Sequence, residues 1–439
     1  MEKKNSNSRD FFDSQKGFIL ACIGSAVGMG NIWLFPYRVG SLGGAAFLIP
    51  YFIFVIVVGY TGIIEEMSFG RNMRKGPLGS FRKVFGNRKG RFLGYIPVIG
   101  SFAMAVGYTV VVAWILRFLA GSITGSAINN NDSGVYFSNI AGRFGAVSWH
   151  IIAIIISFAI MAFGISKGIE KVNKILIPIF YVLFIILAIR VYFLEGAHEG
   201  YAFLLKPDFS KLLNIDTWVF ALGQAFFSLS LAGNGTVVYG SYLKDSDDIP
   251  KSAKYIAIFD VIAAMLAAFI ILPAVFAYGI EPSAGPPLMF ITMPEVFKSM
   301  PFGSVFAIIF FLAVTFAGIT SLINLYETPV EALEDKFNLS RKKSTFIIML
   351  LGLIIGVFLE EADTLGSWMD IISIYITPLG ALLSAIVFFW VIDEKSARSE
   401  INKGTDKKIT DFFYRWSKYG FVIITAIIMI VNIIYKGIG

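Results

Sequence analysis

Long apolar runs separated by short polar and basic segments make up most of this chain. The runs have the length of membrane-spanning helices, because a hydrocarbon core of about 30 Å takes about 20 residues of helix. A membrane barrel would instead need alternating strands of about 10 residues, and these runs are too long and too continuous. The pattern predicts eleven transmembrane helices near residues 17–40, 43–69, 92–122, 148–166, 172–193, 216–242, 253–279, 304–333, 344–360, 366–391 and 417–436.

Composition agrees with a chain that lies in lipid, since 56% of its residues are hydrophobic and only 15% are charged. The first run is long, contains glycines and follows the polar segment 1–16, so we expect a retained tail and not a cleaved signal peptide. A single cysteine, Cys22, excludes disulfides and cysteine metal clusters as organising features. His150 and His198 have no metal-ligand spacing and no catalytic motif is visible, so we do not expect an enzyme.

The net charge of +7 comes mostly from short segments between the runs, so it reports topology and predicts no nucleic-acid partner. With the N-terminus inside the cell, the cytoplasmic segments hold 29 of the 37 Lys and Arg residues. The external segments hold Arg143, Lys206, Lys211, Lys298 and Lys436. This asymmetry predicts a multi-pass protein of the plasma (inner) membrane, with a cytoplasmic N-terminus and an external C-terminus.

Two of the runs, the first and the sixth, have glycine-rich polar centres at residues 24–31 and 228–236. Such centres weaken helix propagation and predict local unwinding, although Gly24 and Gly28 could also form a simple helix-packing face. Broken helices five spans apart are typical of two inverted five-helix repeats that meet at mid-membrane. We therefore predict an all-α polytopic membrane protein with the divisions 1–16 (cytoplasmic tail), 17–193 (first repeat), 194–215 (external connection), 216–391 (second repeat) and 392–439 (cytoplasmic loop and an extra helix).

An unwound segment at mid-membrane can bind a cation through its carbonyls and an anion through the N–H groups of the following helix. A zwitterionic amino acid together with Na⁺ fits these two surfaces. Asp260 is the most informative side chain, because a carboxylate within a span marks an ion path or a proton relay; the alternative is a neutral or salt-bridged structural Asp. Oxygen ligands suited to Na⁺ are found within the apolar runs at Asn31, Ser228, Asp260, Thr320 and Ser321.

Four stretches resemble spans 1, 2, 6 and 8 of the neurotransmitter:sodium symporters, particularly the bacterial amino-acid transporters. They read GSAVGMGNIWLFPY, GGAAFLIPYF, GQAFFSLSLAGNGTVVYGSY and FAGITSLINLYETPVEALEDKF. The resemblance covers nearly the whole chain, and eleven spans are typical of the bacterial branch. It implies a leucine-transporter-type fold and sodium-coupled symport of an amino acid into the cell by alternating access.

The resemblance implies two sodium sites, whose ligands combine backbone carbonyls with side-chain oxygens. The first comprises the carbonyl of Ala26 and the side chains of Asn31, Ser228 and Asp260; the second comprises the carbonyls of Gly24, Val27 and Ala317 and the hydroxyls of Thr320 and Ser321. The chloride positions of the family correspond to Tyr51, Gln224, Ser228 and Ala264. Because Ala264 lacks a hydroxyl and Asp260 supplies a negative charge where relatives often have Asn, we expect no chloride requirement.

The resemblance also implies a substrate site. It places the substrate carboxylate at Met29, Gly30, Tyr108 and the first sodium ion, and the ammonium at the carbonyls of Ala26, Phe227 and Ser228, with Phe227 as an aromatic lid. The side-chain pocket is expected at Met104, Val111, Ser230, Gly233, Ser321 and Leu325. Gly233 replaces a Phe of the bacterial leucine transporter and leaves room for an aromatic substrate, while Asn234 and Asn324 could pair with a phenolic hydroxyl.

We therefore expect a small-molecule amino-acid substrate, tyrosine first, with membrane lipid as the surroundings and the oligomeric state left open. The alternatives are a pocket for leucine or methionine, if a large neighbour fills the space at Gly233, and a non-transporting amino-acid sensor. The family's inner gate corresponds to Arg9, Ser241, Tyr242, Glu327 and Asp335. The outer gate keeps Asp370 but has Leu34 in place of the usual Arg, so Arg38 is the candidate substitute.

Overall fold

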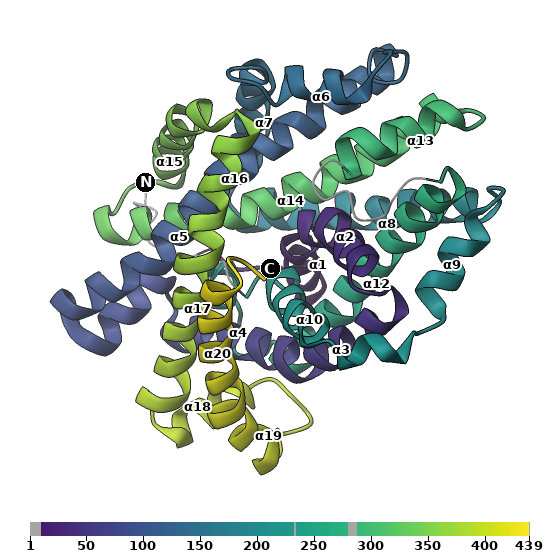
Figure 1. Cartoon of the computed structure of the whole chain (residues 1–439). Helices are drawn as coiled ribbons and strands as arrows, with labels where there is room; N and C mark the ends of the chain where they lie inside the picture. The colour runs from purple at the N-terminus through teal and green to yellow at the C-terminus, as the bar shows by residue number, and fades with distance from the viewer. Residues whose placement is uncertain (1–9, 232–233, 280–287, 439) are drawn as a thin grey trace.

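The computed structural model describes residues 10–231, 234–279 and 288–438. Every regular element in this part of the chain is helical, and the helices pack into one bundle (Figure 1). The all-α prediction is therefore confirmed. The broken first span lies inside the bundle, where α1 packs against α8, α12 and α14.

The spanning helices follow the predicted order, and several of them consist of two pieces. In the first half they are α1 (Gln15–Ala26) with α2 (Phe35–Ser41), α3 (Ala45–Phe54) with α4 (Tyr60–Met73), α5 (Pro77–Thr124), α7 (Val147–Met161) and α8 (Lys171–Tyr192). In the second half they are α10 (Ile215–Ser228) with α11 (Gly235–Ser241), α12 (Ile249–Ala277), α14 (Gly303–Phe337), α15 (Arg341–Gly356), α16 (Ala362–Ile371) with α17 (Thr377–Ile386), and α19 (Asp411–Arg415) with α20 (Val422–Ile434).

Shorter helices connect the spans at both ends of the bundle. They are α6 (Ser133–Ile140), α9 (Ala197–Leu205), α13 (Met293–Ser299) and α18 (Glu394–Ile401). The segment before the third span is also helical, since α5 begins at Pro77 and turns at Gly86, whose φ of 76° lies in the left-handed region. This basic stretch lies between the predicted spans 43–69 and 92–122, and sequence analysis assigned it no helix.

Among the described residues, eight helices are long and apolar enough to cross a membrane, and the bent pair Gln15–Ala26 with Gly30–Ser41 makes nine. The other two predicted spans are α7, which has 15 residues, and the sixth, in which α10 and α11 flank the undescribed residues 232–233. Helices lie at all eleven predicted positions, but in the described part of the chain only nine spans have the required length and apolar character, so the predicted count of eleven is not confirmed.

Both predicted interruptions are present. Helix α1 ends at Ala26, and helical structure begins again at Gly30. The segments Gln15–Ala26 and Gly30–Ser41 are bent by 51° relative to each other. Helix α10 ends at Ser228, and α11 begins at Gly235 after Asn234, whose φ of 50° is left-handed. Glycine-rich sequence permits these breaks because glycine adds little to helix stability.

Backbones touch where α4 meets α11. A Cβ added at Gly70 would lie 1.9 Å from the Val237 carbonyl oxygen, and one at Gly240 would lie 2.5 Å from the Met67 carbonyl oxygen. Small residues of this kind allow close helix packing in membranes. The second half of span 6 is therefore fixed to span 2.

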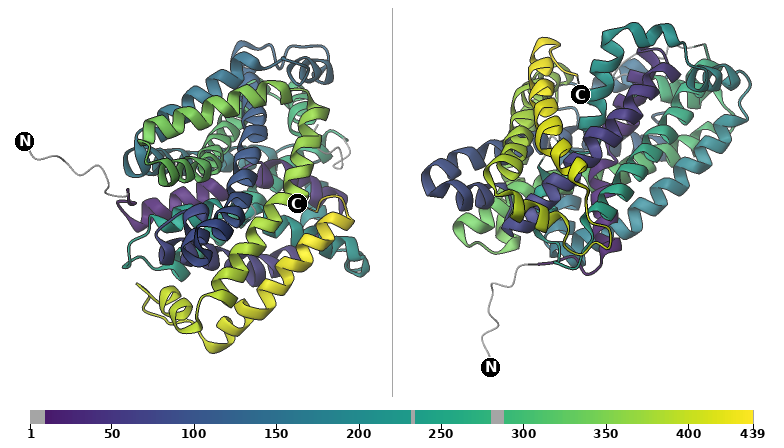
Figure 2. Two further views of the ribbon diagram at one scale, coloured as in Figure 1. Left: turned by 90° about the vertical axis from the view of Figure 1, so that its left-hand side faces the viewer. Right: turned by 90° about the horizontal axis from the view of Figure 1, so that it is seen from below.

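The last helix lies at the margin of the bundle. Figure 2 shows α20 running beside α17, and the two are in contact. The division of the chain into two repeats and an extra helix stays a prediction. We call the end of the bundle that carries segment 10–14, segment 243–248 and α18 the N-terminal face; contacts between Lys244 and Asp13 and between Arg71 and Glu400 hold it together.

Candidate functional site

A buried cavity lies where the two interrupted helices meet. The ends of α1 and α10 form its centre, and α5, α14 and α17 complete its wall. The residues that line it are Ser25, Ala26, Gly28, Met29, Gly30, Met104, Tyr108, Phe227, Ser228, Ser230, Ser321, Leu325 and Thr377. Most of the residues predicted to contact substrate are in this set.

The backbone at Gly28 approaches two hydroxyl groups closely. A Cβ at this position would lie 2.5 Å from the Tyr108 hydroxyl oxygen and 3.0 Å from Ser321 Oγ, so a side chain does not fit without a shift. The next residue, Met29, donates its N–H to the Tyr108 hydroxyl at 3.0 Å. The break in span 1 therefore brings N–H groups and a hydroxyl to the cavity wall, a combination that can bind a carboxylate.

A polar cluster around Asp260 adjoins the cavity. Asn31 Nδ2 donates to Asp260 Oδ1 at 2.7 Å, and Ser228 Oγ donates to Asp260 Oδ2 at 2.8 Å. All three side chains are buried, and among the described residues no Lys, Arg or His side chain pairs with the carboxylate. A buried carboxylate with only neutral partners can be compensated by a bound cation.

A second group of oxygen atoms lies between the end of α1 and α14. Thr320 Oγ1 donates to the Ala317 carbonyl at 3.1 Å, and Ser321 Oγ donates to the Ser25 carbonyl at 3.1 Å. A Cβ at Gly24 would lie 2.9 Å from Thr320 Cβ, so the two backbones are close. The five atoms predicted for the second sodium site therefore come from facing segments, with Ser25 as an additional acceptor that the prediction lacked.

Three of the predicted substrate residues that the structure describes do not line the cavity. Val111 lies outside the lining, and Gly233 lies outside the described residues. Asn234 is 1% exposed, and both polar atoms of its amide lack a hydrogen-bond partner in the described part of the chain. Asn324 lies beside it, because a Cβ at Gly235 would be 2.1 Å from Asn324 Oδ1. Both amides therefore lie close to the start of α11, outside the cavity lining.

Thr377, Ser25 and Gly28 are lining residues that sequence analysis did not select. Ser25 and Gly28 lie inside the glycine-rich motif, whose other residues were selected, so the motif itself indicated this part of the cavity wall. Thr377 follows a π-helical turn in span 10, Ile372–Ile376, and no local pattern marks it as a cavity residue.

The N-terminal face contains part of the predicted inner gate. Tyr242 donates its hydroxyl to Glu327 Oε1 at 2.7 Å, and Arg341 binds both oxygens of the same carboxylate, at 2.6 and 2.5 Å. Asp335 pairs with Lys75, while Arg9, its predicted partner, lies outside the described residues. Ser241 lies next to Tyr242 and donates its hydroxyl to the Val238 carbonyl. Arg341 is a member of this group that sequence analysis did not select.

The sequence matches the sodium:neurotransmitter symporter family over residues 9–132 and 133–438, which include both helix interruptions and both groups of oxygen ligands. The chain belongs to this family. Members of this symporter family are secondary transporters, so the chain is a sodium-dependent membrane transporter and not an enzyme.

The similarity to individual relatives extends over nearly the whole chain. The uncharacterized sodium-dependent transporter YhdH of Bacillus subtilis (strain 168) is 34% identical over 92% of both chains. The uncharacterized sodium-dependent transporter MJ1319 of Methanocaldococcus jannaschii is 33% identical over 98% of this chain and 92% of its own. The crystal structure of MhsT in complex with L-phenylalanine has a TM-score of 0.88 and 33% identity, and the match covers 97% of this chain and 100% of MhsT.

The two predicted outer-gate residues of the symporter, Arg38 and Asp370, have different surroundings. Arg38 places its guanidinium 4.1 Å from the ring centroid of Phe220 on α10, while Asp370 is an exposed residue of α16. No ion pair connects the two within the residues that the structure describes. The substitution of Arg38 for the missing Arg is thus not supported in this conformation, in which the Arg38 side chain is held by an aromatic neighbour.

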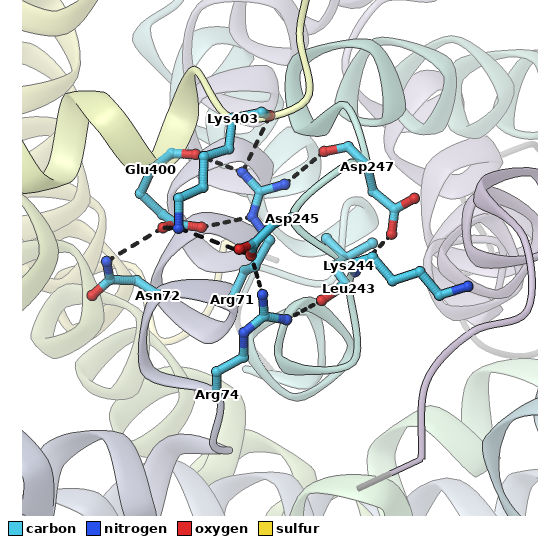
Figure 3. Close-up of polar contacts among 9 residues, drawn as sticks. All are labelled: Arg71, Asn72, Arg74, Leu243, Lys244, Asp245, Asp247, Glu400 and Lys403. Atoms are coloured by element: carbon cyan, nitrogen blue, oxygen red, sulfur yellow. Dashed lines mark hydrogen bonds and ion pairs between the residues drawn. The ribbon is translucent and has the colours of Figure 1, made fainter.

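Figure 3 shows a polar cluster on the N-terminal face of the symporter, none of whose residues lines the cavity. Arg71, at the end of α4, is buried and donates to Glu400 Oε1 at 2.6 Å and to the Asp247 carbonyl at 2.6 Å. Lys403 adds a second ion pair to Glu400 at 2.9 Å. The cluster joins α4, the segment after α11 and α18, and no sequence motif predicted it.

Proposed function

We propose that this symporter couples sodium entry to the uptake of an aromatic amino acid, with tyrosine as the first candidate. The cavity between the two helix interruptions carries the proposal. Its lining includes Ser228, which donates to Asp260, and Ser321, which belongs to the second group of oxygen atoms. The similarity to MhsT, which was crystallised with L-phenylalanine, supports the substrate class.

In the proposed binding mode, the substrate carboxylate lies against the N–H groups of Met29 and Gly30 and the Tyr108 hydroxyl. The ammonium group faces the carbonyls of Ala26, Phe227 and Ser228. The Phe227 ring covers the substrate, and its position supports this role, since a Cβ at Gly30 would lie 3.2 Å from the ring. These groups recognise the part that all amino acids share, so they set the class of substrate and not its side chain.

Selectivity for an aromatic side chain is proposed to come from the break in span 6. A glycine at position 233 leaves the volume of a ring, and the Asn234 and Asn324 amides lie next to this break. Because the Asn234 amide has no hydrogen-bond partner among the described residues, it has capacity for a phenolic hydroxyl. A site that pairs with a hydroxyl discriminates strongly against analogues that lack one.

Two sodium ions are proposed to bind at the predicted ligand sets, with chloride not required. Asp260 supplies a fixed negative charge at the first site, and Ala264 has no hydroxyl to offer an anion. The N-terminal face is proposed to be cytoplasmic. The basic residues Arg71, Arg74, Lys75 and Arg341 gather on it, as expected for the inner side of a membrane protein.

The test is uptake of labelled tyrosine into proteoliposomes under an inward sodium gradient, with all twenty amino acids as competitors. We expect uptake only with sodium, and strongest competition by aromatic amino acids. Gly233→Phe should reduce tyrosine uptake and favour smaller aliphatic competitors. Best competition by leucine or methionine in the wild type would contradict the aromatic pocket, and sodium-dependent binding without accumulation would identify a sensor.

A further inference from the structure

The segment that leads into span 1 is fastened to the start of span 5. Ser166 donates its hydroxyl to the Asp13 carboxylate, and the Asp13 N–H donates to Glu170 Oε2 at 2.7 Å. Ser14 Oγ donates to Glu170 Oε1 at 2.9 Å. These contacts join residues more than 150 positions apart in the sequence, and they lie at the N-terminal end of α1.

Glu170 is the central acceptor of this contact. Its side chain is 1% exposed, and it also pairs with Lys174 one turn later at 2.5 Å. Ser14 caps α1 by accepting the Gly17 N–H at 3.1 Å while it donates to Glu170, so the carboxylate lies at the positive end of the helix. Negative charge is favourable at this end, and hydrogen bonds to a charged acceptor are stronger than those between neutral groups.

The close approach of α1 to Glu170 requires glycine. A Cβ at Gly17 would lie 1.9 Å from Glu170 Oε1 and 2.3 Å from its carboxyl carbon. Any side chain at position 17 would therefore displace either the carboxylate or the helix. Gly17 and Glu170 form a matched pair, and each can be altered independently of the other.

We propose that Glu170 is a gating residue that holds the first half of span 1 closed on the cytoplasmic side. This inference rests on the proposed function, because it assumes that α1 swings away to release substrate into the cell. Opening breaks the Asp13 and Ser14 bonds together. Lys174 stays beside Glu170 on the same helix, so the released carboxylate keeps a partner of opposite charge, and the contact can be broken and remade.

The only cysteine of the chain reports on this motion. Cys22 lies in α1, is 5% exposed, and is the only site at which a thiol reagent can react. In the closed state it is shielded, and displacement of α1 exposes it. The rate of its alkylation by N-ethylmaleimide in the purified full-length protein therefore measures opening, with Cys22→Ser as the blank.

Glu170→Gln and Gly17→Ala are both expected to raise the alkylation rate by about tenfold or more, the factor for loss of one hydrogen bond to a charged group. Gly366→Ala is the matched control for Gly17→Ala, because a Cβ at Gly366 on α16 meets no atom within 4 Å. It should react at the wild-type rate. Gly17→Ala alone decides the outcome if Glu170→Gln fails to fold.

A gating role also predicts a shift in the sodium concentration that protects Cys22 from alkylation, which a purely structural role would not produce. Sodium bound between α1 and α14 should slow alkylation when it replaces choline at constant ionic strength. The variants should need more sodium for half protection than the wild type. Alkylation of both variants at the wild-type rate, or an unchanged sodium midpoint in both, would overturn the proposal for Glu170.

The two proposals fail in different ways. If wild-type proteoliposomes show no sodium-driven uptake, the proposed function is wrong, whatever the alkylation rates are. If uptake is normal and sodium-driven while Cys22 in the two variants stays shielded, the function stands and the assignment of Glu170 is wrong.

Discussion

Replacing Asp260 by Asn removes the one charge of the buried cluster while it keeps the shape of the side chain. Asn31 and Ser228 donate to the two carboxylate oxygens at 2.7 and 2.8 Å, so a cation bound by Asn31 lies only a few ångströms from the negative charge. At a separation of about 4 Å and an effective dielectric constant of about 20, the attraction is on the order of 4 kcal/mol, or roughly a thousandfold in affinity. Part of this is offset because burying the carboxylate is itself unfavourable.

We therefore expect Asp260→Asn to raise the sodium concentration for half-maximal uptake by between about tenfold and a thousandfold. The assay is the initial rate of tyrosine uptake as a function of sodium, measured in chloride and again in gluconate. Wild-type uptake should be equal in both anions, whereas the variant should be inactive in gluconate and partly restored by chloride. Asp363→Asn, at an exposed position of α16, is the control for loss of a carboxylate elsewhere.

Two results would refute this reasoning. The first is a wild-type requirement for chloride, which would mean that the Asp260 charge does not take the anion's place. The second is an Asp260→Asn variant whose sodium dependence is unchanged, which would mean that no cation binds near this carboxylate.

The double substitution Thr320→Ala with Ser321→Ala removes two oxygen ligands of the second sodium site and should abolish uptake; a normal rate with unchanged sodium dependence would remove this site from the mechanism. Arg71→Ala should lower stability by about 3–5 kcal/mol because it leaves Glu400 buried without its main partner, which a fall in the thermal unfolding temperature in detergent would report. Gly240→Ala should lower that temperature too, since the added Cβ would lie 2.5 Å from a backbone oxygen of α4, and an unaltered temperature would contradict the tight contact of the two helices.

The sequence predicted those features that depend on neighbouring residues. Apolar runs of spanning length gave the helices, and the glycine-rich centres gave the two interruptions, because both properties are local. The family motifs also led to most of the cavity lining. Side-chain contacts that form only in the folded chain were harder to foresee. In the sequence, Arg341 looks like any other basic residue between two spans. Only the folded chain brings its guanidinium within 2.6 Å of the Glu327 carboxylate.

Glu170 and Arg71 illustrate the same limit. Each is a charged residue near the end of an apolar run, where charged residues are common and do not mark a buried contact. Glu170 is buried because Gly17 on another helix allows a close approach, and both residues have partners more than 150 positions away in the sequence. The role of Gly233 stays a prediction from the sequence.

The Arg71 cluster constrains the order in which the protein is completed in the membrane. Glu400 lies 329 residues after Arg71, so most of the chain is synthesised and inserted before the carboxylate that neutralises this guanidinium exists. Until α18 arrives, Arg71 remains in water or in contact with lipid headgroups, since burial of an unpaired charge is strongly unfavourable. The junction of α4 with the segment after α11 can therefore close only late in biogenesis. A nascent chain truncated before α18 should keep this face open to proteolysis, and α18 added as a separate peptide should protect it.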